Sequence, residues 1–300
     1  MTLQVSTFPV PGLLPRSPNL ATLLVSCTDQ RGMVATLAQL LYAHGAHLLD
    51  TDQHTDVPAG RVFQRIRFDA SEVYPDLATV ERAIREVAAR SEMTYRLHDS
   101  KRPKNVAIFV SRYEHCLHDL LLRHRLGELP CSIALAISNH PDLRAVASQF
   151  GVPFHVVKVD PDDKRRAEAE QLALLEAHRI DLVIFARYMQ VVSADFTRRY
   201  PFGIINIHHS FLPAFVGQKP YHQAHERGVK LIGATAHYAT PDLDEGPIIE
   251  QDVARISHRD AVDDLVRKGR DLEKVVLARA VRSHLEDRVL VHGNKTVVFD

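Results

Sequence analysis

Two short segments of the chain hold side chains that could carry out acid–base or carbonyl chemistry. In the apolar segment Ile204–Pro213, Asn206 and His208 stand two residues apart, so they face the same side of a strand. The segment Pro241–Pro247 follows another apolar run and is dense in carboxylates. Amide and imidazole N–H groups can stabilise the negative charge that develops on a carbonyl oxygen under attack, and a carboxylate can assist proton transfer. Each signal is weak alone, because the chain holds 18 histidines and loop carboxylates are usually solvated.

These residues lie where strand-like and helical patterns alternate, which predicts a parallel sheet in a doubly wound, mostly parallel α/β domain. The predicted strands are residues 105–110, 132–138, 154–157, 182–186, 203–208 and 229–238. The predicted helices include residues 116–125, 143–150, 164–178 and 261–286, and a hairpin follows over residues 288–299. Ligands gather beyond the carboxyl ends of the strands in such sheets, which is where Asn206 and His208 would stand.

The first hundred residues predict a separate, smaller domain. Its expected elements are strands at 19–27, 46–55, 61–68 and 91–98 and helices at 33–44 and 76–90, in the order βαββαβ. Residues 1–18, with four prolines, are predicted to form an extended arm. The expected boundaries are therefore 19–99 for the first domain, 100–103 for a linker and 104–300 for the second domain.

Composition narrows the classes of partner. Lys plus Arg number 37 and Asp plus Glu number 37, so no general attraction to nucleic acid or to an anionic membrane is expected. No apolar run approaches the length of about 20 residues that spans a bilayer, and the N-terminus lacks a signal-peptide pattern. Three cysteines without a CxxC pair fit a reducing compartment. We therefore expect a cytoplasmic protein.

The βαββαβ order, with the turn Asp29–Gly32 opening the first helix, resembles the ACT family of small regulatory domains, whose members commonly bind amino acids. The resemblance covers residues 19–99 and implies a ferredoxin-like fold. It also implies an amino-acid effector site at Asp29, Gln30, Arg31 and Gly32, and pairing into a homo-oligomer. A domain that only mediates dimerisation is the alternative.

The segment NIHHSFLPAFVGQKPYHQAHERGVKLIGATAHYATPDLDEGPIIEQD, residues 206–252, resembles the formyltransferase-hydrolase family built around 10-formyltetrahydrofolate, and within it the deformylases. The resemblance extends over residues 104–300. It implies hydrolysis of 10-formyltetrahydrofolate to formate and tetrahydrofolate, which supplies formate for purine synthesis and balances the one-carbon folate pool. The folate is the substrate, and no cofactor is implied.

By this resemblance Asn206, His208 and Asp244 form a catalytic triad. Asn206 and His208 would stabilise the charge on the formyl oxygen, and His208 is the candidate proton donor to the departing N10 nitrogen. Asp244 would hold His208 and deprotonate the attacking water. Which of His208 and Asp244 is the main general base is left open.

The resemblance also places two segments around the pterin ring of the folate. They contain Arg187, Tyr188, Met189, Gln190, Val191 and Val192, and Ala239, Thr240, Pro241, Asp242, Leu243 and Gly246. Plain core packing is the alternative for Met189, Val191 and Val192.

Transfer of the formyl group to an amine, as in glycinamide-ribonucleotide transformylases, is the main alternative function. In transformylases the corresponding loop is rich in glycine and binds the phosphate of the substrate. The loop Val110–His115 has no glycine and contains a carboxylate, so a phosphate should bind poorly there. His209 and Tyr221 are candidates for narrowing the acceptor pocket to water, or they simply fix the loop after His208. No nucleic-acid partner is expected, because the chain lacks the extra C-terminal domain of methionyl-tRNA formyltransferases.

Two further classes of protein are disfavoured by the sequence. A metal-dependent hydrolase is suggested by His208, His209, His222 and His225 within 18 residues and by His115 with His118, but no HExxH motif accompanies them. We therefore expect no metal. A non-catalytic amino-acid sensor is disfavoured because the triad residues are all present.

Overall fold

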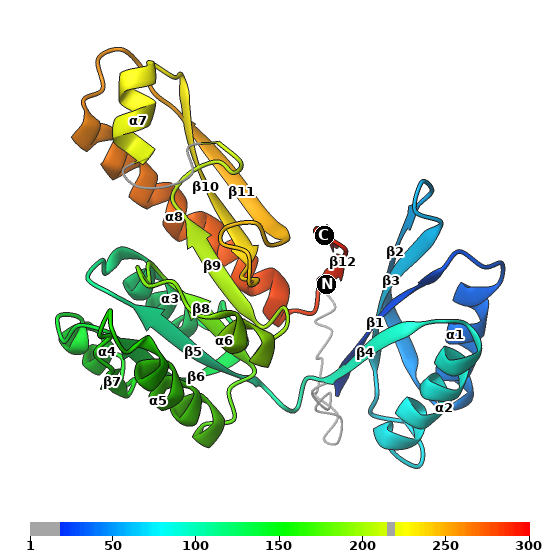
Figure 1. Cartoon of the computed structure of the whole chain (residues 1–300). Coiled ribbons are helices and arrows are strands. Elements are labelled where there is room, and N and C mark those ends of the chain that lie inside the picture. Colours follow the sequence, from blue (N-terminus) through cyan, green and yellow to red (C-terminus); the bar gives the residue numbers. More distant parts are fainter. Residues whose placement is uncertain (1–18, 215–219) are drawn as a thin grey trace, which may run out of the picture. The chain divides into compact units, whose positions relative to one another are not determined.

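The structure is a computed structural model, and it describes residues 19–214 and 220–300. The extended arm predicted over residues 1–18 lies outside the described residues. The chain divides into two compact units between Arg102 and Pro103 (Figure 1). No helix within the described ranges is long and apolar enough to cross a membrane.

The N-terminal unit has the order βαββαβ. Its elements are β1 (Leu20–Thr28), α1 (Met33–Ala43), β2 (His47–Asp56), β3 (Arg61–Asp69), α2 (Leu77–Arg90) and β4 (Thr94–Asp99). The strands form an antiparallel sheet in the order β2-β3-β1-β4, and both helices lie on one face of it (Figure 1). This ferredoxin-like arrangement confirms the predicted fold.

Local signals explain where the helices of this unit begin and end. Gly45 follows α1 with φ 82°, and a Cβ at this position would lie 2.5 Å from the carbonyl oxygen of Glu72. Asp76 caps α2 by accepting a hydrogen bond from the Thr79 backbone N–H at 2.7 Å. Both helix ends therefore follow from residue type.

The C-terminal unit is built on a seven-stranded sheet. Its elements are β5 (Lys104–Val110), α3 (His115–Arg125), β6 (Cys131–Ser138), α4 (Arg144–Gln149), β7 (Phe154–Val156), α5 (Lys164–Ala177), β8 (Leu182–Phe185), α6 (Ala194–Arg199), β9 (Ile204–His208), α7 (Pro220–Arg227), β10 (Leu231–Tyr238), β11 (Ile248–Arg255), α8 (Val262–Leu285), β12 (Val289–His292) and β13 (Lys295–Val298). The sheet order is β11-β10-β9-β8-β5-β6-β7, and β12 pairs with β13 in a separate hairpin.

Alternate residues of β5 pack into cores on opposite faces of this sheet. Val106 and Ile108 belong to a cluster with α3 and α8, whereas Ala107 and Phe109 belong to a cluster with α5 and α6. Strands buried on both faces explain the continuous apolar runs in the sequence. The predicted doubly wound domain is confirmed.

The run predicted as a strand over residues 229–238 differs from expectation in direction. β10 runs antiparallel to β9, and β11, which was not predicted, continues the antiparallel edge. The helices α6 and α7 were also not predicted. An apolar run gives no strand direction, and short elements give weak periodicity.

The strand order creates a switch point between β5 and β8. The chain builds outward from β5 through β6 to β7, then crosses back to β8 on the other side of β5. A crevice therefore opens at the carboxyl ends of these strands. The segments after β8 and β9 both lie at this edge.

Candidate active site

β9 brings Asn206 and His208 to the same face of the sheet. Ile205 and Ile207, which alternate with them, are buried in the core that includes α3 and α8. The apolar residues thereby fix the strand, and the polar pair is directed to the opposite side. The expected juxtaposition of an amide and an imidazole is present.

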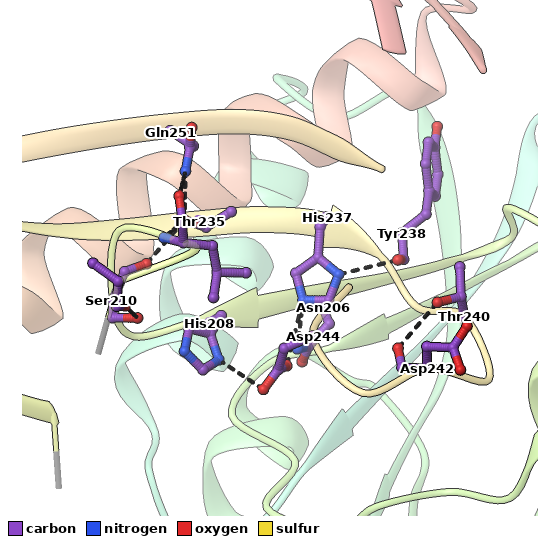
Figure 2. A network of polar contacts seen from close by, with 12 residues as sticks. Asn206, His208, Ser210, Thr235, His237, Tyr238, Thr240, Asp242, Asp244 and Gln251 are labelled. Atoms are coloured by element: carbon purple, nitrogen blue, oxygen red, sulfur yellow. Dashed lines mark hydrogen bonds and ion pairs between the residues drawn. The ribbon is translucent and has the colours of Figure 1, made fainter. Parts of the chain in front are cut away.

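Asp244 reaches this pair from the loop after β10. Its Oδ2 lies 3.3 Å from His208 Nδ1, and its Oδ1 lies 3.6 Å from His237 Nε2 (Figure 2). Asp244 has φ 56°, a left-handed conformation that aspartate tolerates better than most residues. The structure thus gathers the three predicted triad residues at one place.

The contacts of Asp244 determine its charge. Burial alone would raise the pKa of its carboxyl, but the hydrogen bond from His208 and then the interaction with His237 outweigh burial and hold the pKa well below its ordinary value. Asp244 is therefore a carboxylate that accepts the Nδ1–H of His208. The other ring nitrogen, His208 Nε2, is buried and has no hydrogen-bond partner among the described residues.

His237 is a site residue that sequence reasoning missed. In the antiparallel β9–β10 pair it lies opposite Asn206, and its Nε2 accepts a hydrogen bond from Asn206 Nδ2 at 3.2 Å. Its Nδ1 donates to the Tyr238 carbonyl oxygen at 3.0 Å (Figure 2). The backbone bond fixes the ring, which in turn orients the Asn206 amide. A histidine near the end of a predicted strand was the available signal, but only the pairing register gives it a partner.

Thr235 fixes the loop after β9. Its Oγ1 donates to the Ser210 carbonyl oxygen at 2.9 Å and accepts from the Leu212 N–H at 3.1 Å and from Gln251 Nε2 at 2.9 Å (Figure 2). The first two bonds are buried, and the bond from Gln251 is partly buried. They secure the backbone that follows His208.

A cavity of about 360 Å³ opens beside the triad. It is lined by Phe185, Arg187, Tyr188, Met189, Gln190, Val191, Val192, Thr197, Asn206, Ile207, His208, His209, His237, Ala239, Thr240, Pro241, Asp242, Leu243 and Asp244. Every residue predicted to surround a pterin ring is among them except Gly246. Phe185, Thr197, Ile207 and His237 are lining residues that were not predicted.

Three apolar side chains on this lining are largely exposed. Met189 is 53%, Val191 56% and Leu243 62% exposed. Core packing, the alternative weighed for Met189 and Val191, is therefore wrong for these two residues. Val192 is partly buried against the core that includes α5 and α6.

Gly246 has a packing role. A Cβ at this position would overlap the Tyr238 carbonyl oxygen. The glycine therefore allows the loop after β10 to lie close against that strand.

His209 and Tyr221 are adjacent, with ring centroids 6.0 Å apart, and His209 is 5.2 Å from the His208 ring. His209 lines the cavity, whereas Tyr221 lies behind it and donates a hydrogen bond from its hydroxyl to Glu273 Oε1 at 2.8 Å. Burial and then the positive charge of Arg187 lower the pKa of His209 to about 4. His209 is therefore neutral near pH 7.

In the described part of the chain, the histidines suggested as metal ligands do not form one cluster. His222 and His225 are exposed on α7, whereas His208 is buried. Ligand atoms of His115, Cys116 and Glu273 do lie within 4.8 Å of one another. His115 Nε2 already contacts Glu273 Oε2 at 2.7 Å, and burial raises the pKa of the Cys116 thiol well above its ordinary value. These contacts suit a neutral thiol beside a hydrogen-bonded His115–Glu273 pair rather than a thiolate ligand.

The predicted effector residues lie in the N-terminal unit. Asp29, Gln30, Arg31 and Gly32 are exposed in the turn between β1 and α1. Gly32 stands at the N-cap of α1 with φ 87°. The turn leads into the first helix as expected.

The fold and site define a class of protein. A family model described as formyl transferase matches residues 104–281, and the chain belongs to this family. A formyltetrahydrofolate deformylase from Synechocystis sp. is 53% identical over 93% of this chain and 98% of its own length. The predicted family is confirmed.

The chain is also similar to solved structures of a deformylase and, in its C-terminal part, of a transformylase. A formyltetrahydrofolate deformylase from Pseudomonas syringae is 48% identical, with a TM-score of 0.93 over 96% of each chain. A glycinamide ribonucleotide transformylase from Symbiobacterium toebii is 31% identical, with a TM-score of 0.63 over 68% of this chain and 98% of its own.

Proposed function

We infer that this chain hydrolyses 10-formyltetrahydrofolate to formate and tetrahydrofolate. The inference rests on its similarity to formyltetrahydrofolate deformylases along nearly the whole chain. The site observation that best supports it is His208, held by Asp244 through Nδ1 while Nε2 has no hydrogen-bond partner in the described chain. By this activity the protein would supply formate for purine synthesis and balance the one-carbon folate pool.

The geometry supports a distribution of roles within the triad. Water adds its oxygen to the formyl carbon while one of its protons passes to His208 Nε2, and the carbonyl oxygen becomes negatively charged. The Asn206 amide, oriented by His237, and His208 Nε2–H are the donors for that charge. The C–N10 bond then breaks, N10 regains a proton from His208, and formate departs.

Asp244 suits electrostatic support of His208 better than accepting the proton of water. A general base works best when its pKa lies near the working pH, whereas the pKa of Asp244 is held low. As a carboxylate beside Nδ1, it would favour the protonated His208 ring that the departing nitrogen needs. We therefore propose His208 as the main proton carrier.

The folate would occupy the cavity beside the triad. A flat pterin ring needs an apolar slot with a few polar partners. The exposed side chains of Met189, Val191 and Leu243 on the lining meet the first need. The polar backbone of residues 239–244 would meet the second.

Transfer to an amine is the alternative, because the catalytic unit also resembles a transformylase. The β5–α3 loop argues against a phosphate-bearing acceptor. Tyr113 of this loop stacks below the Arg187 guanidinium at 4.9 Å, and Ser111 is committed to Asn139 at 2.7 Å and to the Met189 N–H at 3.1 Å. Side chains of the loop and their contacts therefore occupy the space that a phosphate would need.

The test is incubation of purified protein with 10-formyltetrahydrofolate and no amine, following formate and tetrahydrofolate. Stoichiometric formate from the wild type, with loss of at least about a hundredfold in Asp244→Asn, supports the assignment. Glu245→Gln is the matched control, since this exposed carboxylate follows Asp244 on the same loop and does not line the cavity. Turnover only after an amine is added would make the protein a transferase.

The N-terminal unit is proposed as an amino-acid sensor in a cytoplasmic homo-oligomer. An effector bound near Asp29–Gly32 would shift hydrolysis only by binding two states unequally. Calorimetry and rates with glycine, methionine and serine test this, and sedimentation tests the assembly. Absence of both binding and rate change across the panel would remove the sensor role.

A further inference from the structure

Glu273 is a buried carboxylate that the proposed mechanism does not use. It lies on α8 with 1% of its surface exposed. Its Oε1 accepts from the Tyr221 hydroxyl at 2.8 Å, and its Oε2 lies 2.7 Å from His115 Nε2 and 3.5 Å from Arg187 Nε. Burial would raise the pKa of Glu273, but His115, Arg187 and Tyr221 together lower it. One buried carboxylate thus connects α3, α7 and the segment after β8 to α8.

Gly269, one helical turn before Glu273, provides the second half of this arrangement. A Cβ at this position would overlap the hydroxyl oxygen and Cζ of Tyr221 and lie 2.6 Å from its Cε1. Glycine in a helix interior lowers helix stability relative to alanine. The helix therefore carries a locally unfavourable residue where the Tyr221 ring is seated.

This seat backs one wall of the catalytic cavity. Tyr221 packs against His209, and His209 and Arg187 line the same cavity as Asn206 and His208. Arg187 itself is 8% exposed and adopts φ 64°, a left-handed backbone conformation that is uncommon for arginine. The wall is thus built from side chains held in place from behind by Glu273.

We propose that Glu273 and Gly269 are positioning residues that select water as the acceptor, by holding Tyr221, His209 and Arg187 as a closed wall beside the formyl carbon. The proposal rests on the proposed function. In hydrolysis water adds oxygen to the formyl carbon, the C–N10 bond breaks and N10 takes up a proton. A primary amine would add nitrogen at the same carbon, but its substituent needs the space that the wall fills.

Three variants, two on α8 and one on α7, open the wall: Gly269→Ala displaces Tyr221, Glu273→Ala removes the contacts of the carboxylate, and Tyr221→Ala removes the ring. Each is incubated with formyl-labelled 10-formyltetrahydrofolate and glycinamide, and formylated amine is measured against formate. We expect this product ratio to rise about tenfold or more over the wild type. Because it is a ratio, it does not depend on how much active protein each preparation holds.

Matched controls separate positioning from general damage. Glu273→Gln retains Oε1 as acceptor for Tyr221 but loses the charge that faces Arg187, so it should raise the ratio less than Glu273→Ala does. Asp271→Ala removes an exposed carboxylate from the same helix, where it pairs with Lys274 at 2.8 Å, and should keep the wild-type ratio. Circular dichroism melts establish that each variant is folded.

The outcomes distinguish this proposal from the proposed function. Absence of formate from the wild type without amine would contradict the hydrolase assignment itself. Formate from the wild type, with folded opened variants that form no more formylated amine than it does, would overturn the wall alone. Folded variants that lose hydrolysis without gaining transfer would overturn it too, because the cluster would then support the reaction rather than choose the acceptor.

Discussion

His237 lies directly opposite Asn206 across the antiparallel β9–β10 pair and accepts its side-chain amide hydrogen at 3.2 Å. The same ring donates to the Tyr238 carbonyl oxygen, so its orientation is fixed by the backbone. The Asn206 amide is therefore held by a residue from a neighbouring strand rather than by its own packing.

Replacing His237 should damage catalysis more than substrate binding. We expect His237→Phe to lower kcat by about a hundredfold, comparable to loss of one oxyanion donor, with little change in KM. His237→Gln can still accept from Asn206 and should lose less. Steady-state kinetics test this, with the exposed His222→Gln as control. Equal losses in both His237 variants would argue that the imidazole does more than orient Asn206.

The apolar rim of the cavity should contribute binding rather than chemistry. Leu243→Ser removes an exposed side chain that a bound pterin would cover, so KM should rise about tenfold while kcat changes little. Leu126→Ser is the matched control, because Leu126 is 64% exposed and does not line the cavity. A fall in kcat at constant KM would place Leu243 in the chemical step instead.

His209 should make the folded state sensitive to mild acid. Its pKa is lowered to about 4 in the folded protein, against an ordinary value near 6.5. Between these values the unfolded chain binds a proton that the folded chain does not, so the free energy of unfolding falls as the pH falls. The loss is fully developed below about pH 4, and its slope reaches at most about 1.4 kcal/mol per pH unit.

Urea unfolding at pH 7 and pH 5 tests this behaviour. His209→Asn does not titrate, so its free energy of unfolding should fall by about 2 kcal/mol less than that of the wild type. His225→Asn, which changes an exposed histidine, should behave as the wild type does. Parallel losses in His209→Asn and the wild type would assign the acid sensitivity to other groups.

Much of the fold could be predicted because the elements carry strong local signals. The helix over residues 33–44 and that over 76–90 lie close to α1 and α2, since their apolar spacing and end residues agree. The buried strands β5 and β8 were evident as continuous apolar runs between helices. Pattern and chain order were sufficient for the class of both units.

Strand direction and side-chain partners could not be predicted. The apolar run over residues 229–238 carries no signal for strand direction. The antiparallel direction of β10 and the pairing of His237 with Asn206 therefore could not be predicted. The role of Glu273 could not be predicted for a different reason. A glutamate in a helix is ordinarily solvated, and its partners Tyr221 and His115 are 52 and 158 residues away in sequence.

Because β10 runs antiparallel to β9, the length of the loop after β10 helps to determine where Asp244 lies. β10 ends at Tyr238 beside Ile205 near the start of β9, while Asp244 must return to His208 at the other end of that strand. Five residues, Ala239–Leu243, cover this path through bends and turns, so the position of Asp244 depends on the turns that they make. Chain length here is thus as much a catalytic parameter as residue type. Deleting one residue from this loop should abolish turnover even with every site residue retained, whereas an inserted glycine should cost less because slack can be folded away.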